Sequence, residues 1–270
     1  MLSGGPEVSV LPGRIEIVPI GDVVASVRAV IPRTTTISVT SLPHHPIEAT
    51  LSVASALRQD GYRVIPHLAA NRIGTDRQLR TVLSTLATDD IDMVFAIGGD
   101  GIPNPGGFPD GITLLERIRQ LTGDSFSIGA ATYPEAHPHM DAARVLDVVR
   151  AKAAHADYLV TQMCFSAEPV TSHLRELAAA DIRLPVWIGI PGAVRFTKLL
   201  AIAARIGVQT SLSFAQKGGN RRLLGRYSPT ELIDGITQGA ERATLPLAGF
   251  HRYTFNDLST STAAGPEAAK

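Results

Sequence analysis

The sequence has no net charge and almost no cysteine. Its 25 Lys and Arg residues balance 25 Asp and Glu residues, so that the formal net charge at pH 7 is zero. A chain without excess positive charge has no electrostatic reason to bind nucleic acid or an anionic membrane, and small molecules are better candidates for its ligands. The single cysteine, Cys164, excludes an internal disulfide and any cysteine-based zinc cluster, which is typical of a reducing compartment.

Signals for secretion and for membrane insertion are also missing. Residues 1–6 lack the basic and apolar regions of a signal peptide, and no apolar run approaches the length of a membrane span. We therefore expect a cytoplasmic protein without a membrane partner. The oligomeric state is not predicted by any pattern in the sequence.

The most informative stretch is an apolar run, residues 91–97, that stops at Gly98-Gly99-Asp100-Gly101. Its length and its turn residues predict a strand buried on both faces of a parallel sheet. The glycines allow the backbone to approach a ligand closely, and Asp100 is presented at the end of the strand. A tight turn with a solvated carboxylate explains the same residues equally well.

Strand-like and helix-like segments alternate eight times without interruption. This count favours a (β/α)8 barrel over an open doubly wound sheet, and it places a single domain at residues 1–258. The Ser-, Thr-, Ala-, Gly- and Pro-rich residues 259–270 are predicted to be a disordered tail. The predicted strands are 14–20, 34–40, 62–68, 91–97, 126–131, 158–162, 185–190 and 248–254, and the predicted helices are 22–30, 46–60, 75–89, 110–121, 141–154, 169–180, 196–206 and 229–241.

Polar side chains occur at or just beyond the carboxyl ends of successive predicted strands, namely Thr40, His67, Asp100, Tyr133 and Gln162. Residues in these positions of a barrel converge on one rim, where the active sites of such barrels are found. Glu16 differs because it lies within the first strand, among apolar residues. An unpaired charge there would be costly, so Glu16 must have a partner, stay protonated or face a cavity.

Several segments resemble the methylenetetrahydrofolate reductase family, in the family's order and near its spacing. The resemblance extends from about Ile15 to Asn256. Its most specific segments are Pro66-His67-Leu68, Tyr133-Pro134-Glu135-Ala136-His137-Pro138, Thr161-Gln162 and His251-Arg252-Tyr253-Thr254-Phe255-Asn256. Ile15-Glu16-Ile17-Val18-Pro19 is similar to the first-strand segment that carries the family's acid. The resemblance implies a (β/α)8 barrel that reduces 5,10-methylenetetrahydrofolate to 5-methyltetrahydrofolate with hydride from NADH or NADPH.

The resemblance also implies roles for individual residues. Glu16 would supply the proton, and Asp100 with Gln162 would hold the pterin of the folate. Phe196 matches an aromatic residue that stacks on the nicotinamide nucleotide. No Rossmann glycine motif with its ribose-reading acid is present, so the sequence does not distinguish NADH from NADPH.

Members of this family usually carry FAD, and six positions match residues that touch it: Thr40, His67, Gly99, Tyr133, His137 and Lys152. Two features depart from the family pattern. Gly98 stands where the family has an arginine before Gly99-Asp100, and the segment between the first two strands is shorter. A diphosphate without that arginine loses charge-assisted hydrogen bonds worth roughly 1.5–3 kcal/mol each. We therefore expect FAD to be absent and hydride to pass directly from nicotinamide to folate.

Two other functions fit parts of the sequence. Gly98-Gly99-Asp100-Gly101 resembles a loop of the NAD and diacylglycerol kinases, which would make the protein a nucleotide kinase. However, Ile102 stands where those families have a threonine. A barrel that binds flavin or folate without reducing it is the third interpretation. No metal ligands are predicted.

Overall fold

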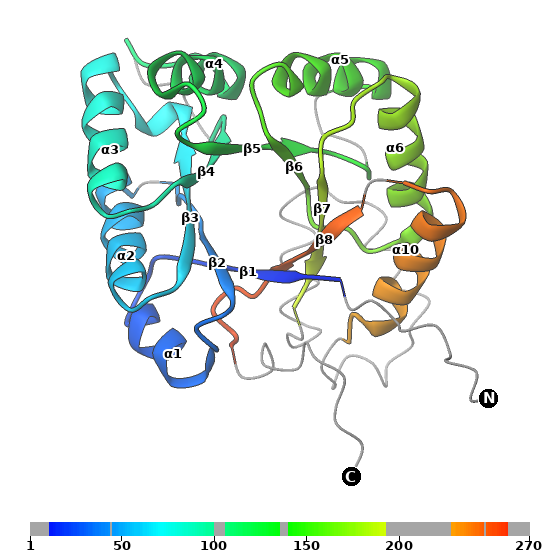
Figure 1. Ribbon diagram of the computed structural model, residues 1–270, viewed down its shortest axis with the longest axis horizontal. Helices are drawn as coiled ribbons and strands as arrows, with labels where there is room; N and C mark the ends of the chain where they lie inside the picture. The colour runs from blue at the N-terminus through cyan, green and yellow to red at the C-terminus, as the bar shows by residue number, and fades with distance from the viewer. Residues whose placement is uncertain are drawn as a thin grey trace, which may run out of the picture.

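The computed structural model describes residues 11–43, 45–99, 106–135, 140–192, 228–245 and 247–258. Eight parallel strands form a closed barrel in sequence order, with β1 hydrogen-bonded to both β2 and β8. Helices surround the strands, with α1 to α3 on one side and α6 and α10 on the other (Figure 1). The predicted (β/α)8 barrel is therefore confirmed.

The strands are β1 Gly13–Ile17, β2 Thr36–Val39, β3 Arg63–Ala69, β4 Met93–Ile97, β5 Ser127–Thr132, β6 Tyr158–Thr161, β7 Val186–Pro191 and β8 Leu247–Tyr253. The helices are α1 Val23–Val30, α2 Ile47–Gln59, α3 Asp76–Thr88, α4 Gly111–Thr122, α5 Ala142–Ala153, α6 Ala167–Ala179 and α10 Thr230–Arg242, with a 3-10 helix, η1, at Ala70–Arg72.

The largest differences from the predicted elements are at the beginning of the chain. The first strand ends at Ile17 rather than at residue 20, because Pro19 has no N–H for the sheet and the Ile20 N–H turns back to the Val18 carbonyl. The second strand begins at Thr36 because the preceding residues form a turn, in which the Thr35 N–H donates to the Pro32 carbonyl. The 3-10 helix was not predicted. The predicted helix 196–206 and the predicted tail 259–270 lie outside the described residues.

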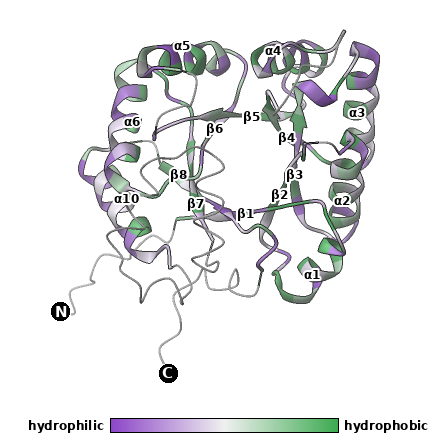
Figure 2. Ribbon diagram, turned by 180° about the vertical axis from the view of Figure 1, so that it is seen from behind, coloured by the Kyte–Doolittle hydropathy of each residue, from purple (hydrophilic) through white to green (hydrophobic). Residues whose placement is uncertain are grey.

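Successive side chains of a strand point to opposite faces, so each strand contributes to two environments. On β1, Ile15 and Ile17 join the main apolar core between the barrel and its helices. Arg14 and Glu16 occupy the other face, inside the barrel. Inside, a second apolar cluster is formed by Ile65, Phe95, Tyr158 and Val160. In Figure 2, β4 is largely hydrophobic whereas β1 is mixed.

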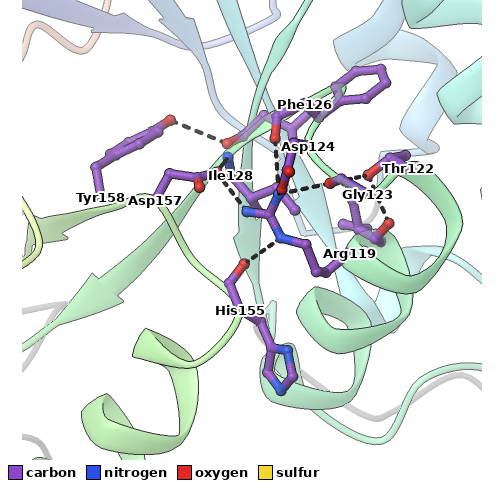
Figure 3. Close-up of polar contacts among 11 residues, drawn as sticks. Arg119, Thr122, Gly123, Asp124, Phe126, Ile128, His155, Asp157 and Tyr158 are labelled. Carbon is purple, nitrogen blue, oxygen red and sulfur yellow. Dashed lines mark hydrogen bonds and ion pairs between the residues drawn. The ribbon is translucent and has the colours of Figure 1, made fainter.

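Side chains cap helix ends, and one polar network holds α4 against the barrel. Thr75 and Asp110 cap α3 and α4 by accepting from the backbone N–H groups three residues on. At the amino ends of β5 and β6, Arg119 of α4 donates to Asp157 (2.6 Å) and to the His155 carbonyl (3.1 Å) (Figure 3). Asp157 also accepts from the Ile128 N–H at 2.6 Å, which fixes where β6 begins.

None of the helices in the described part of the chain combines the length and the apolar character that a membrane span requires.

Candidate active site

The centre of the candidate site is Glu16, whose carboxyl lies inside the barrel against two imidazoles. Its Oε2 is 3.0 Å from Nε2 of His251 on β8 and 3.5 Å from Nε2 of His67 on β3. His67 Nε2 also lies 2.7 Å from the Ser38 hydroxyl of β2. Three neighbouring strands thus surround a side chain that is only 13% exposed.

The backbone around Glu16 is held by the residues that follow β8. The Thr254 hydroxyl donates to the Glu16 carbonyl at 2.6 Å. The Asn256 side chain accepts from the Val18 N–H and donates to the Val18 carbonyl, both at 2.8 Å. These three bonds fix the end of β1 and therefore the direction in which the Glu16 side chain leaves the strand.

Burial controls the protonation of this cluster. It raises the pKa of Glu16 to about 8, although the positive charge of Arg14 acts in the opposite direction. Burial, followed by repulsion from Arg14, lowers the pKa of His67 to about 3 and that of His251 well below its usual value. At neutral pH the carboxyl is therefore protonated and both imidazoles are neutral, so neither contact is an ion pair, and the contact with His251 is a hydrogen bond. A carboxyl in this state can act as a general acid.

Arg14 is a second buried ionisable group on the interior face of β1. Its guanidinium carbon lies 4.8 Å from the ring centroid of Tyr158 and 4.1 Å from that of Trp187. Such cation–π contacts contribute about 0.5–2 kcal/mol each. Burial lowers the pKa of Arg14 to about 10, which still leaves the guanidinium charged at neutral pH.

Gln162 follows β6 directly and faces the carboxyl end of the barrel. Its N–H donates to the Thr132 carbonyl at 2.9 Å, which continues the pairing of β5 with β6 by one residue. Its side-chain oxygen is buried and has no hydrogen-bond partner among the described residues. Because a buried acceptor without a donor is costly, this oxygen is a candidate for contact with a ligand.

Glu135 holds the loop after β6. Its Oε1 accepts from the backbone N–H groups of Phe165 and Ser166 at 2.7 and 2.9 Å, and burial raises its pKa. Its Oε2 is buried without a partner in the described residues. Glu135 thereby connects the loop after β5 to the loop that carries Gln162.

The positions that the family resemblance assigns to FAD occupy varied environments. Lys152 of α5 is buried and donates from Nζ to the Ala131 carbonyl at 2.9 Å. The same Nζ lies 5.3 Å from the centroid of the Tyr133 ring. Burial lowers its pKa to about 8. The Thr40 N–H donates to the Ile17 carbonyl at 3.0 Å, which places Thr40 just beyond β2. Gly99 has φ +82°, and a Cβ added there would meet the side chain of Asn71.

The predicted site residues are thus brought together only in part. Glu16 and His67 are in contact, whereas Thr40, Gly99, Tyr133 and Gln162 follow the carboxyl ends of their strands. Asp100, His137 and Phe196 lie outside the described residues. Sequence reasoning missed four residues of the cluster and its surroundings: Arg14, Ser38, Glu135 and His251. A signal was present for three of them, because Arg14 alternates with Glu16 on one strand face, and Glu135 and His251 each lie in a segment that resembles the family.

Among the described residues, no group of three or more His, Cys, Asp or Glu side chains is arranged to hold a metal ion.

Comparisons with known proteins point to one family. The sequence is 32% identical over 107 residues to methylenetetrahydrofolate reductase 2 of Saccharomyces cerevisiae, covering 38% of this chain and 17% of that protein. It is 26% identical over 175 residues to methylenetetrahydrofolate reductase (NADH) 1 of Arabidopsis thaliana, covering 58% of this chain and 29% of that protein. The chain therefore spans less than a third of the length of these curated relatives.

A solved structure shares the fold over almost the whole chain. It is the C-terminal domain of a chitinase-like protein from Desulfitobacterium hafniense, with a TM-score of 0.53, 11% identity and coverage of 94% of this chain and 96% of that chain. At this identity the likeness concerns the fold alone. The family model for methylenetetrahydrofolate reductase matches residues 24–217, which is more than half of the sequence. The chain belongs to the methylenetetrahydrofolate reductase family.

Proposed function

We propose that this protein reduces 5,10-methylenetetrahydrofolate to 5-methyltetrahydrofolate with hydride from NADH or NADPH. The observation that carries the proposal is the Glu16 carboxyl, which is protonated at neutral pH and held inside the barrel by the neutral His251 imidazole at 3.0 Å. The chemistry needs an acid to help open the methylene bridge. Few carboxyls remain protonated at neutral pH, and this one lies where the family's acid is expected.

The reaction is balanced by one proton from Glu16 and one hydride from the nicotinamide. The acid proton comes from the Glu16 carboxyl, whose Oε2 is hydrogen-bonded to His251 Nε2 at 3.0 Å. Transfer of this proton to N10 of the folate breaks the N10–methylene bond and leaves an iminium between the methylene carbon and N5. The hydride from C4 of the nicotinamide then adds to the methylene carbon. The carboxylate left on Glu16 regains a proton from solvent before the next turnover.

Binding of the folate is assigned to the carboxyl end of the barrel. The buried oxygen of Gln162, which has no partner among the described residues, supports a contact with donor groups on the pterin edge. Asp100 is assigned to the same ring by the family resemblance alone, and Phe196 is assigned on the same ground to the nicotinamide.

We further propose that hydride passes directly between the two substrates, without a flavin. The residues at the positions implied for FAD fit its diphosphate poorly, because Gly98 supplies no guanidinium. The ammonium of Lys152 is already bonded to the Ala131 carbonyl and buried beside Tyr133. Direct transfer requires the nicotinamide and the folate to be bound at the same time, with the donor and acceptor carbons in contact.

Steady-state kinetics test both proposals. NADH oxidation should depend on added 5,10-methylenetetrahydrofolate. If the protein does not oxidise NADH when this folate is added, it is a binding barrel without reductase activity. Initial-rate plots against NADH at several folate concentrations should intersect, as expected for a ternary complex, and added FAD should not raise the rate. Parallel lines, a yellow purified protein or a requirement for FAD would restore a flavin as the intermediate carrier.

A further inference from the structure

Arg14 is a buried ionisable group that the proposed reaction does not use. It lies two residues before Glu16 on the same strand, and its side chain points to the same interior face. Because a strand rises about 3.3 Å per residue, the two Cα atoms are about 6.6 Å apart. Arg14 is nearer the amino end of the barrel, so it lies on the side of Glu16 that is away from the rim where the substrates bind.

The guanidinium is fixed from two sides. Its carbon lies 4.8 Å from the centroid of the Tyr158 ring and 4.1 Å from that of Trp187. The Tyr158 ring is itself immobilised, because its hydroxyl donates to the Val94 carbonyl at 3.1 Å. The residue before it, Asp157, is bound by Arg119 and by the Ile128 N–H (Figure 3).

A purely structural role explains this arrangement poorly. Nε and Nη2 of Arg14 are buried and have no hydrogen-bond partner among the described residues. A buried cation with unmet hydrogen bonds destabilises the fold, and an apolar side chain of similar size would fill the same space without that penalty. The charge itself therefore requires an explanation.

We propose that Arg14 is a positioning residue that acts through Glu16. Its fixed positive charge stabilises the carboxylate that Glu16 becomes when it releases its proton, and so keeps Glu16 a competent acid inside an apolar barrel. This role deepens the proposed reductase function and rests on it. Charge placed in advance where a transition state develops the opposite charge is a common source of rate enhancement.

The other groups around Glu16 cannot supply this charge. Its neighbours with ionisable side chains in the described part of the chain are Arg14 on β1, His67 on β3, and His251 and Tyr253 on β8; β2 contributes only the uncharged Ser38. Both histidines have a lowered pKa and Tyr253 a raised one, so all three are neutral near pH 7. Burial alone raises the pKa of Glu16, and Arg14 is the group that lowers it again.

The test is the pH titration of Glu16 with and without the guanidinium. In Arg14→Met, the infrared band of the protonated Glu16 carboxyl, identified by its loss in Glu16→Gln, should persist to a pH higher by about one unit or more. The basic limb of the kcat profile should move in the same direction, and the melting temperature should stay the same or rise. Arg14→Gln serves as a second neutral variant if the methionine variant does not fold.

Arg252→Met is the matched control. Arg252 is also partly buried, and its Nε has no partner in the part of the chain that the structure describes, but it alternates with His251 on β8 and faces away from the barrel interior. This variant should leave the Glu16 band unchanged. The proposal would be overturned if Arg14→Met or Arg14→Gln folds but loses the Glu16 infrared band at the same pH as the wild type, with the basic limb of its kcat profile also unmoved. The infrared titration needs no substrate, so it gives a result even if the chain does not reduce folate.

Discussion

The raised pKa of Glu16 predicts a measurable loss of stability with rising pH, which Glu16→Gln should remove. In the folded protein the carboxyl titrates at about pH 8, against 4.5 for an unperturbed glutamate. Between these two values the unfolded chain is ionised at this residue and the folded chain is not. Each pH unit of increase therefore favours the unfolded state by roughly 1.4 kcal/mol. Below pH 4.5 the effect vanishes, and above about pH 8 it is fully present.

The comparison is made between pH 6.5 and pH 8, where both neighbouring imidazoles are neutral in the folded protein, and their titration in the unfolded chain is common to both proteins and cancels in the difference. Over this range wild-type stability should fall by about 1.5–2 kcal/mol relative to the glutamine variant. Urea unfolding of both proteins at several pH values measures the difference directly. Parallel curves would refute the reasoning, because they would mean that Glu16 is ionised in the folded protein at neutral pH and is not a proton donor.

Three further predictions concern single residues. Glu16→Gln should lower kcat about 10²–10⁴-fold while near-wild-type circular dichroism is retained, and a near-normal kcat would place the proton donor elsewhere. Gln162→Leu should raise KM for the folate more than KM for NADH, whereas equal changes in steady-state assays would argue against a pterin contact. Gly99→Ala should destabilise the fold by about 1–3 kcal/mol in urea unfolding, because φ is +82° and the new Cβ meets Asn71. Its matched control, Gly98→Ala, should change stability little, since its nearest contact is Gly111 N at 3.7 Å, and equal effects would contradict this account.

Local patterns in the sequence were sufficient to predict the barrel and to single out Glu16 as a candidate site residue. Glu16 was identifiable because a carboxylate inside an apolar strand demands an explanation, and Thr40 and Gln162 because they end strands. These inferences need only the period of a strand and the direction of parallel strands.

The partners of Glu16 depend on information that local patterns do not carry. His251 is 235 positions from Glu16 in the sequence, and the two meet because β8 pairs with β1 in the register that sets Arg14 opposite His251. A shift of that register by one residue would turn His251 out of the barrel. The roles of Ser38 and Glu135 likewise depend on which loops lie side by side once the barrel has closed.

The hydrogen bonds from Thr254 and Asn256 to β1 also have a consequence for folding kinetics. They join residues 238 positions apart, so the chain must close a loop of nearly its full described length before they form. In a refolding chain whose β8 has not yet docked, Glu16 lacks the His251 imidazole and lies at an open sheet edge in contact with water. There its carboxyl ionises like an ordinary glutamate, and the chain lacks the proposed proton donor. During refolding at neutral pH, the proposed reductase activity should therefore return only with docking of β8, after the helical signal has recovered.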